Sequence, residues 1–318
     1  MTEVDHAARR PHRAPRFRPA GGGGRVGTGG SHPEFVELEL PPLPRTTAPS
    51  SVSVGVVDTG VVQIDGQVHP YLTGRVTGRA DEVEGDIRSA EPEFGHGTFV
   101  SGRILYNAPR STVSMRRGLL PRDADGEFED RTVAAAITSL ADEGVKLINL
   151  SFVGEDDEDD PPAEIRDAMA CAVIEHNVVF VVAAGNNFDV AHRYPAEFAT
   201  DAEFGGHVLA VADRSTWSGE PSWVAAFADG QRRLGPLAAV GLFGVPAFAW
   251  ARWSGSSFAA ATVTGMLAAG AARLADQGSR QPVVDAAAQA GLLGPRDHAP
   301  LEIVGVDDPI DPSTGGRG

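Results

Sequence analysis

From residue 51 onward, short apolar runs alternate with longer segments whose apolar residues recur at helical spacing. Short runs rich in β-branched residues are typical of strands buried on both faces of a parallel sheet. The longer segments are typical of helices that cover such a sheet. The pattern predicts strands over residues 52–57, 112–120, 145–152, 178–183 and 208–212, and helices over residues 132–143, 163–176 and 257–275.

The alternation of strands and helices predicts the fold class, because it is the pattern of βαβ units. We expect an α/β protein of three layers, with a mostly parallel central sheet and helices on both faces. The main domain is expected to span residues 51–278. Residues 279–318 are expected to form a C-terminal helix and a flexible tail.

The first 50 residues have a different composition. Residues 1–33 are rich in Arg, Pro and Gly and lack apolar periodicity, so we expect them to be disordered. Residues 35–40 alternate as a strand does, and the prolines that follow favour an extended chain. The early arginines precede no apolar region, so they do not predict a secretion signal, and we expect a cytoplasmic protein.

Composition narrows the choice of partners. Hydrophobic residues make up 42% and charged residues 22% of the 318 residues, which is ordinary for a globular protein. A formal net charge of −16 argues against a nucleic-acid partner, and no apolar run is long enough to predict a membrane partner. The single cysteine, Cys171, excludes an intrachain disulfide and a cysteine-based zinc site, and we expect it in the core.

Two motifs place an acid and a base beside predicted elements. Asp58 ends the apolar strand in residues 56–60 (Val-Val-Asp-Thr-Gly), although an aspartate that caps a turn explains it equally well. His96 lies in residues 94–102 (Phe-Gly-His-Gly-Thr-Phe-Val-Ser-Gly), where the glycines allow close approach of neighbouring backbone. A surface histidine in a glycine loop explains the His-Gly pair but not the whole segment.

Two further motifs supply a hydroxyl and an amide. Ser257 lies in residues 255–265 (Gly-Ser-Ser-Phe-Ala-Ala-Ala-Thr-Val-Thr-Gly), at the start of a long apolar helix. The N–H groups of a helix start favour developing negative charge, although a capping serine is a common alternative. Asn186 follows an almost wholly apolar strand, which places its carboxamide at the same edge of the sheet. The four motifs together are more specific than any one of them.

With these motifs in this order, the sequence resembles the subtilisin-like serine proteases (subtilases, peptidase S8) over residues 51–278. Residues 145–152 are similar to the family's substrate-binding edge strand, and residues 194–196 and 208–211 are similar to segments that follow the Asn-bearing strand. The resemblance implies a subtilisin-like fold and a serine endopeptidase that acts on protein or peptide substrates.

The resemblance also implies a role for each residue. Asp58 would orient His96, and His96 would take the proton of the Ser257 hydroxyl as this attacks the scissile carbonyl. Asn186 and the Ser257 N–H would then hold the oxyanion of the tetrahedral intermediate on the way to an acyl-enzyme. No cofactor is implied, and the oligomeric state stays open.

The resemblance outlines the pocket for the residue before the scissile bond (P1). Its walls would be Ser151, Phe152, Val153, Ala183, Ala184 and Gly185. Arg193 aligns near the pocket floor, where a guanidinium would favour an acidic P1 residue. The six carboxylates of residues 155–160 would favour basic substrates if they overhang the cleft, and otherwise form a solvated loop.

The sequence departs from the family pattern at its calcium sites. Tyr71 stands where the family's His-Pro-Asp-Leu segment has its aspartate, and residues 103–109 leave no room for the usual calcium loop. We therefore expect no metal at that site, since a hard cation needs oxygen ligands, while calcium elsewhere stays open. Phe99 and Ala261 replace a usual histidine and proline and are expected to have little effect.

Two alternatives stay open. Residues 35–45 are either a short inhibitory extension that crosses the cleft or a solvated linker, since an extended segment can pair with an exposed edge strand. The chain itself is either an enzyme or a catalytically silent, subtilase-like peptide-binding module. An aspartic protease is disfavoured because it needs a second Asp-Thr-Gly or Asp-Ser-Gly turn, and the sequence has none.

Overall fold

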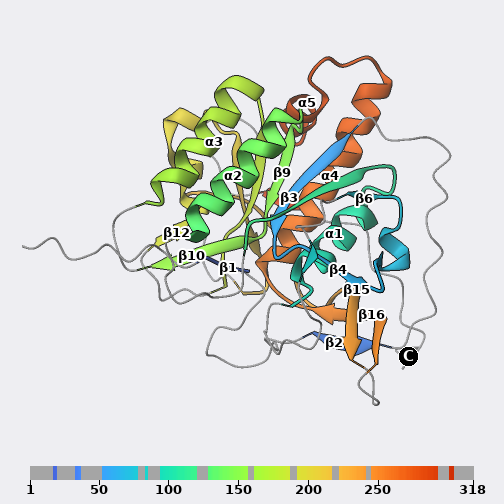
Figure 1. Cartoon of the computed structure of the whole chain (residues 1–318). Coiled ribbons are helices and arrows are strands. Elements are labelled where there is room, and N and C mark those ends of the chain that lie inside the picture. Colours follow the sequence, from blue (N-terminus) through green and yellow to red (C-terminus); the bar gives the residue numbers. More distant parts are fainter. Residues whose placement is uncertain are drawn as a thin grey trace, which may run out of the picture.

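A central parallel sheet organises the computed structural model of the chain (Figure 1). The structure describes residues 17–19, 33–36, 52–77, 83–84, 94–119, 128–156, 161–186, 192–216, 222–240, 245–292 and 301–303. Within these ranges the sheet has eight strands in the order β17-β14-β13-β11-β9-β3-β8-β6, and every neighbouring pair is parallel. The strands are β3 (Ser53–Asp58), β6 (Val76–Thr77), β8 (Thr112–Arg117), β9 (Leu147–Leu150), β11 (Val179–Ala183), β13 (Val208–Asp213), β14 (Val224–Ala228) and β17 (Leu301–Ile303).

Helices cover both faces of this sheet, which confirms the predicted three-layer α/β fold. Helices α2 (Phe128–Asp142) and α3 (Ala163–His176) contact each other on one face. Helices α1 (His96–Asn107) and α4 (Ser256–Asp276) contact each other on the opposite face, and α5 (Pro282–Gln289) lies against α4. The predicted helix over residues 163–176 has the observed bounds.

The apolar runs are continuous because each strand contributes to two cores. Successive residues of a strand point to opposite faces of the sheet. In β3, Val54 and Val56 join the core beneath α1 and α4, whereas Val57 joins the core beneath α2 and α3. In β11, Val181 and Phe180 divide in the same way. Both faces of each strand therefore have to be apolar.

One predicted strand is two strands in the structure. The pattern predicts a single strand over residues 145–152, but the chain leaves the central sheet at Ser151. Beyond it, β10 (Phe152–Asp156) joins a separate antiparallel sheet between β1 (Phe17–Pro19) and β12 (His192–Tyr194). Hydrophobicity could not reveal this break because residues on both sides of it are buried.

The prediction that Cys171 lies in the core is wrong, because the structure exposes it on α3. Its neighbour Ala172 is buried, whereas Ile174, one turn further on, is 69% exposed. A stretch of small apolar residues hid which face of the helix is outward. Cys171 lies on α3, which covers the face of the sheet opposite α1 and α4.

Besides the β1-β10-β12 sheet, two more small sheets are present among the described residues. Strands β15 (Arg233–Val240) and β16 (Pro246–Trp253) form an antiparallel hairpin, and β2 (Glu34–Val36) pairs with β16. Strand β16 leads directly into α4 and so sets where that helix begins. A third small sheet contains β4 (Val61–Ile64), β5 (Gln67–Val68) and β7 (Val83–Glu84).

Helix α4 packs against the central sheet and also contacts α1 and α5. Among the described residues it alone has the length and hydropathy of a membrane-spanning helix, but 67% of its apolar window is buried inside the protein. That burial is typical of a core helix.

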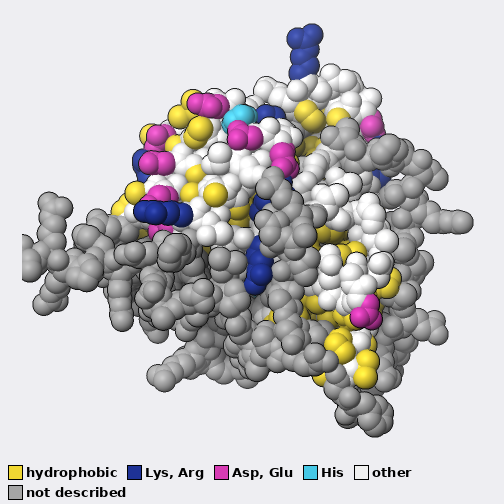
Figure 2. All heavy atoms as spheres, in the orientation of Figure 1, with side chains coloured by type: hydrophobic (Ala, Val, Ile, Leu, Met, Phe, Trp, Pro, Cys, Tyr) yellow, Lys and Arg dark blue, Asp and Glu magenta, His cyan; other side chains and the backbone are white. Residues whose placement is uncertain are grey.

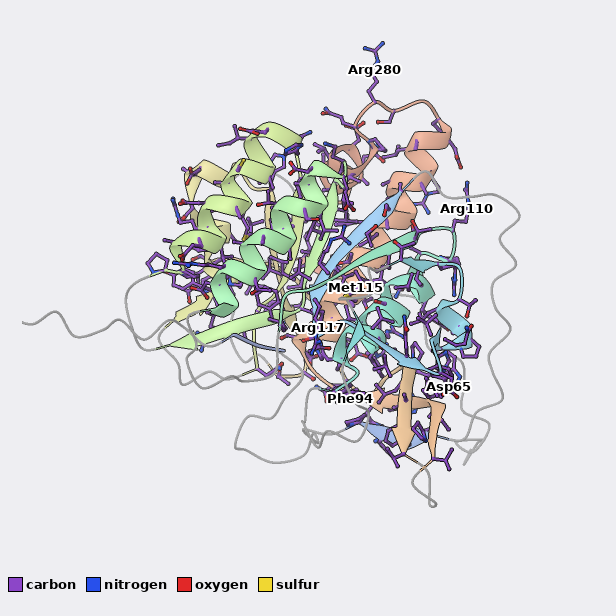
Figure 3. All side chains as sticks on the ribbon, in the orientation of Figure 1. Asp65, Phe94, Arg110, Met115, Arg117 and Arg280 are labelled. Carbon is purple, nitrogen blue, oxygen red and sulfur yellow. The ribbon has the colours of Figure 1, made fainter. Side chains whose placement is uncertain are left out.

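Acidic side chains of the described residues gather over α2 and α3 on the surface in Figure 2. In Figure 3, Arg110 and Arg280 project at the periphery while the fully buried Met115 lies inside.

The predictions of disorder over residues 1–33 and of a flexible tail after residue 305 fall almost wholly outside the described residues. Within the C-terminal segment, α5 contacts α4 and β17 pairs with β14 at the edge of the sheet. The strand β17 was not among the strands predicted from the sequence.

Candidate active site

An acid and an imidazole meet at the carboxyl end of the central sheet. Asp58 is the last residue of β3 and pairs in register with Arg117 of β8, which is labelled in Figure 3. His96 is the first residue of α1, and its Nδ1 lies 2.8 Å from Asp58 Oδ1 and 3.1 Å from Oδ2. Since a carboxylate accepts, Nδ1 carries the proton of the neutral ring and Nε2 carries the lone pair.

Glycine makes this approach of α1 to β3 possible. A Cβ on Gly97 would lie 2.4 Å from the carbonyl oxygen of Gly60, which no neighbouring backbone could tolerate. The Gly97 N–H instead donates to Thr59 Oγ1 at 3.1 Å, and the Thr59 N–H donates to Asp58 Oδ1 at 2.7 Å. The glycines after Asp58 and after His96 therefore bring the turn and the helix together.

The imidazole of His96 is held on its other sides by aromatic rings. The ring of Trp253 stands edge-on to it at 5.5 Å, and the ring of Phe258 lies 5.5 Å away. Asp58, His96 and Ser257 are all 0% exposed. His96 Nε2 is buried without a hydrogen-bond partner among the described residues. A buried nitrogen in that state is costly, so it favours an incoming hydroxyl.

Ser257 lies in the first turn of α4, directly before Phe258. Its Oγ donates to the carbonyl oxygen of Ser151 at 2.9 Å and not to His96. Ser151 Oγ returns a hydrogen bond of 3.0 Å to the Ser257 carbonyl. The structure thus joins the acid to the imidazole and bonds the predicted nucleophile to Ser151, between β9 and β10. Among the described strands, each of these two has a neighbour on both sides, so neither is an edge strand.

Two polar residues of this network were missed by the sequence analysis. Asn149 Nδ2 donates to Ser151 Oγ at 2.7 Å, and Thr264 Oγ1 donates to Asn149 Oδ1 at 2.9 Å. All three side chains are buried. The available signal was polarity in an apolar context, namely an asparagine within strand β9 and a threonine within a helix rich in alanine. The network fixes Ser151 relative to α4.

Asn186 follows β11 and faces the start of α4. Its Oδ1 accepts a hydrogen bond of 2.9 Å from the Ser256 N–H. This bond orients the carboxamide, so that the Nδ2 end points away from that N–H. Gly185, before it, has a φ of +85°, a left-handed conformation that suits glycine. The structure therefore brings Asn186 beside the residue that precedes Ser257.

The expected pocket residues lie on neighbouring segments. Ser151, Phe152, Val153, Ala183 and Ala184 are buried where β10 leaves β9 and where β11 ends. A Cβ built on Gly185 would lie 3.4 Å from Val153 Cγ1 and 3.7 Å from Arg193 Cδ. Gly185, Val153 and the stem of Arg193 are thus adjacent. Arg193 itself is 8% exposed on β12, opposite Glu155 of β10. Residues 157–160 of the acidic run lie outside the described residues.

Two N-terminal segments pair with strands near the site: β1 with β10, and β2 with β16. β1 pairs antiparallel with β10, with Pro19 opposite Phe152 and Phe17 opposite Gly154. The sequence analysis considered residues 35–45 for that place, but Phe35 pairs with Ala251 of β16. Residues 37–45 lie outside the described residues. The N-terminal segment that pairs with β10 is therefore Phe17–Pro19.

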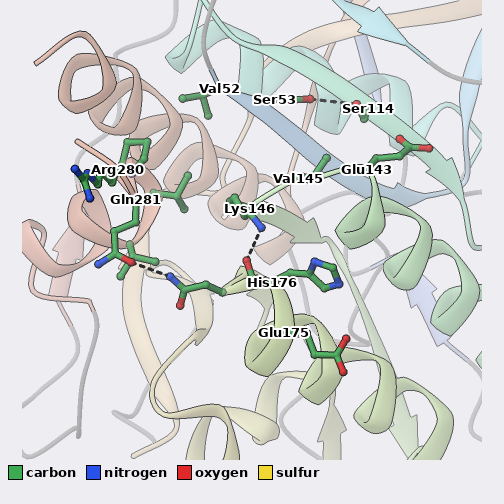
Figure 4. Close-up of a pocket in the computed structure, with 15 residues that line it drawn as sticks. Val52, Ser53, Ser114, Glu143, Val145, Lys146, Glu175, His176, Arg280 and Gln281 are labelled. Atoms are coloured by element: carbon green, nitrogen blue, oxygen red, sulfur yellow. Dashed lines mark hydrogen bonds between the residues drawn. The ribbon is translucent and has the colours of Figure 1, made fainter. Parts of the chain in front are cut away.

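A separate cavity of about 460 Å³ lies at the other, amino end of β3 and β9 (Figure 4). Lys146 Nζ donates there to the carbonyl of His176 at 2.7 Å, and Asn177 Nδ2 donates to Gln281 Oε1. Its lining includes Glu143, Glu175 and His176, and the hydroxyls of Ser53 and Ser114 bond to each other there at 3.1 Å. In the described ranges, no three His, Cys, Asp or Glu side chains gather as metal ligands. The expectation that no calcium binds at the segment around Tyr71 stays a prediction.

Fold and site together define a class: a three-layer α/β protein whose sheet edge carries the acid, imidazole, hydroxyl and amide that serine proteases use. Comparison with known proteins names the family. The model of the subtilase family (peptidase S8) matches residues 50–288, so the chain belongs to the subtilases, as its sequence motifs predicted.

Individual relatives agree with this assignment. Thermitase of Thermoactinomyces vulgaris is 32% identical over 160 residues, which cover 47% of this chain and 53% of thermitase. Fervidolysin of Fervidobacterium pennivorans is 32% identical over 166 residues, covering 47% of this chain and 22% of fervidolysin. The match thus spans about half of the first relative and less of the second.

Solved structures share the fold. Fervidolysin, described as a keratinolytic enzyme related to subtilisin, superimposes with a TM-score of 0.54 at 26% identity, over 73% of this chain and 37% of that one. A lanthipeptide protease superimposes with a TM-score of 0.55 at 22% identity, over 74% of this chain and 77% of that one.

Proposed function

We propose that the protein is a serine endopeptidase that hydrolyses peptide bonds in protein or peptide substrates. The observation that carries this proposal is the 2.8 Å contact between His96 Nδ1 and Asp58, beside the helix whose first turn contains Ser257. Membership of the subtilase family supports the same chemistry.

In the proposed mechanism, Asp58 holds the tautomer of His96 in which Nε2 is the base. Rotation of the Ser257 side chain about χ1 carries Oγ from the Ser151 carbonyl to Nε2, which satisfies the buried nitrogen. Ser257 then attacks the scissile carbonyl as His96 takes its proton. The same proton passes to the leaving amine when the acyl-enzyme forms, and water completes the hydrolysis.

The oxyanion would be held at the start of α4. The Ser257 N–H and the Nδ2 of Asn186 are the proposed donors. The bond from the Ser256 N–H to Asn186 Oδ1 supports this role, since it fixes which end of the carboxamide can donate. The positive end of the long α4 dipole adds to the stabilisation of negative charge.

A proteome-derived peptide library tests this proposal, with products identified by mass spectrometry. The wild type should cleave peptides, and Ser257→Ala should abolish every cleavage. Ser256→Ala is the matched control, because it removes the neighbouring hydroxyl and keeps the backbone N–H that donates to Asn186 Oδ1. Cleavage that survives in Ser257→Ala would contradict the proposed nucleophile.

One observation favours a catalytically silent peptide-binding module as the second candidate. The Ser257 side chain is 0% exposed, and its hydroxyl is bonded to Ser151 instead of His96. A module of this kind would bind an extended peptide along β10 without cleaving it. It predicts no cleavage by the intact chain or by any truncated form.

Strand β1 offers another explanation for the buried Ser257 hydroxyl. We propose that β1 takes the place of a substrate strand on β10, and that it lowers the activity of the intact chain without abolishing it. Deleting residues 1–20 should raise kcat/KM, whereas deleting residues 1–12, which precede β1, should not. Equal activity of the two truncations and the intact chain would show that β1 does not inhibit.

Substrate preference is proposed from Arg193. Its stem lies beside Gly185 and Val153, two of the expected pocket walls, which places it to pair with an acidic P1 side chain. Arg193→Gln should remove a preference for cleavage after Asp or Glu in the peptide library. A library cleaved after Leu or Phe, with no preference for acids in the wild type, would rule out this assignment.

A further inference from the structure

A buried carboxylate outside the proposed triad lies at the same edge of the sheet. Asp213 is the last residue of β13 and is 0% exposed. Its Oδ1 accepts from the Ser215 N–H at 3.2 Å and from the Gly230 N–H at 3.1 Å. Its Oδ2 accepts from Gln231 Nε2, and both oxygens lie 3.1 Å from Ser215 Oγ. These donors are neutral, so within the described residues hydrogen bonds hold the carboxylate in place.

Gly230 connects this carboxylate to the nucleophile helix. The Gly230 carbonyl accepts a hydrogen bond of 3.1 Å from the Gly255 N–H. The two backbones touch, because a Cβ on Gly230 would lie 2.4 Å from the Gly255 carbonyl oxygen and 3.1 Å from Asp213 Cγ. The hydrogen bond from Gly230 to Asp213 therefore holds the Gly230 backbone in contact with the Gly255 backbone.

Gly255 in turn begins the turn that presents Ser257. Its φ of +154° and ψ of 162° are a conformation that glycine permits, and its carbonyl accepts the N–H of Phe258 at 3.0 Å. The next N–H, that of Ser256, is the one bonded to Asn186. A shift of Gly255 would thus displace both the proposed nucleophile and its oxyanion donor.

We propose that Asp213 is a positioning residue for the proposed reaction. It fixes Gly230, Gly230 fixes Gly255, and Gly255 sets the first turn of α4. This inference rests on the proposed role of Ser257. Its expected signature is a loss in kcat with little change in KM, because the pocket walls on β10 stay in place while the nucleophile moves. A misplacement of about 1 Å can cost on the order of 10²-fold in rate.

The kinetic experiment compares Asp213→Leu, Asp213→Asn and Asp229→Leu in the full chain, at temperatures well below each melting point. Asp213→Leu removes the acceptor and should lower kcat by about 10- to 100-fold. Asp213→Asn keeps an oxygen for the Gly230 N–H and should rescue kcat to within about threefold of wild type. Asp229→Leu is the matched control, because this carboxylate also neighbours Gly230 but is exposed.

A second variant covers the case in which Asp213→Leu does not fold. Gly230→Ala leaves Asp213 intact, and its Cβ would clash with the carbonyl oxygen of Gly255. It should also lower kcat at least about tenfold. Wild-type kcat in Gly230→Ala, or in a folded Asp213→Leu, would overturn the proposal. So would an equal loss in Asp229→Leu, which would indicate a general effect of the loop.

Hydrogen exchange of the Gly255 and Ser256 amides, measured by NMR, tests the contact between Gly230 and Gly255 independently of catalytic activity. Exchange should be at least about tenfold faster in Asp213→Leu than in wild type and unchanged in Asp229→Leu. Unchanged exchange in Asp213→Leu would overturn the positioning role. If the wild type cleaves no peptide, the proposed function fails, and the exchange measurement still decides whether Asp213 holds α4.

Discussion

His96 and His69 are buried to nearly the same extent, 0% and 1% exposed, in surroundings that give them opposite chemistry. His96 meets the Asp58 carboxylate at 2.8 Å. His69 lies among aromatic rings, 5.4 Å from Phe248 and 5.2 Å from Trp250, and its Nδ1 accepts the Tyr71 N–H. Burial lowers the pKa of His69 to about 4, and a backbone hydrogen bond at Ala249 opposes part of that shift.

The difference teaches that a buried histidine is assigned by the partner of its ring nitrogens. A carboxylate on Nδ1 makes the other nitrogen a base and stabilises the charged ring that forms when it takes a proton. An apolar surrounding disfavours that charged ring and leaves a structural histidine. Sequence context separates the two in the same way, since only His96 lies in a glycine-rich segment before a helix.

The largest expected effect separates the two histidines directly. His96→Ala should lower kcat on the order of 10⁶-fold, the loss typical of removing the base in subtilases, because nothing else accepts the serine proton. His69→Asn keeps an acceptor for the Tyr71 N–H and should leave kcat little changed. Steady-state kinetics on a cleaved library peptide measures both. A comparable loss in both variants would remove the distinction.

The oxyanion donor extends the comparison to an amide. Asn186→Leu should lower kcat by about 10²–10³-fold, because it removes the proposed Nδ2 donor. KM should change less than kcat, since the donor acts on charge that develops in the transition state. Retained kcat would mean that Asn186 only anchors the Ser256 N–H.

The pKa of His69 predicts how stability depends on pH. Between pH 6.5 and about 4 the unfolded chain binds a proton at His69 that the folded chain does not. The free energy of unfolding should therefore fall as the pH falls through this window, by up to about 3 kcal/mol. Urea unfolding at pH 7 and pH 4 measures the fall, and His69→Asn should reduce it. An equally steep dependence in the variant would contradict the assignment.

The smallest expected effect concerns the segment that follows His69. Tyr71 is buried where the family pattern has a calcium-binding aspartate. Excess EDTA should therefore leave the melting temperature unchanged, because that segment lacks a carboxylate ligand for a hard cation. A fall of several degrees, restored by added calcium, would reveal a calcium site elsewhere in the chain.

The sequence predicted most of the features that depend on local pattern. Apolar runs located β3, β8, β9, β11 and β13 of the central sheet but not β6, β14 or β17. The four motifs pointed to Asp58, His96, Asn186 and Ser257 at one edge of the sheet. These succeed because strand ends and helix starts carry local signals, such as the glycines around His96 and before Ser256.

Features that depend on long-range pairing could not be predicted. The break at Ser151 follows from the pairing of β10 with β1 and β12, which come from distant parts of the chain. Asn149 and Thr264 meet only after β9 and α4 have packed together. Asp213 acts through a backbone contact between two glycines, which no local pattern reveals.

Mapping the adduct of a serine-directed fluorophosphonate tests the central claim most directly, because the reagent reacts only with an activated hydroxyl. The intact chain and the form lacking residues 1–20 are labelled, digested and sequenced by fragmentation mass spectrometry, which separates Ser257 from Ser256. Modification of Ser257 alone, lost in His96→Ala, is the predicted result. An adduct on Ser256 or Ser151, or no adduct on either form, would contradict the proposal that Asp58, His96 and Ser257 act as one catalytic unit.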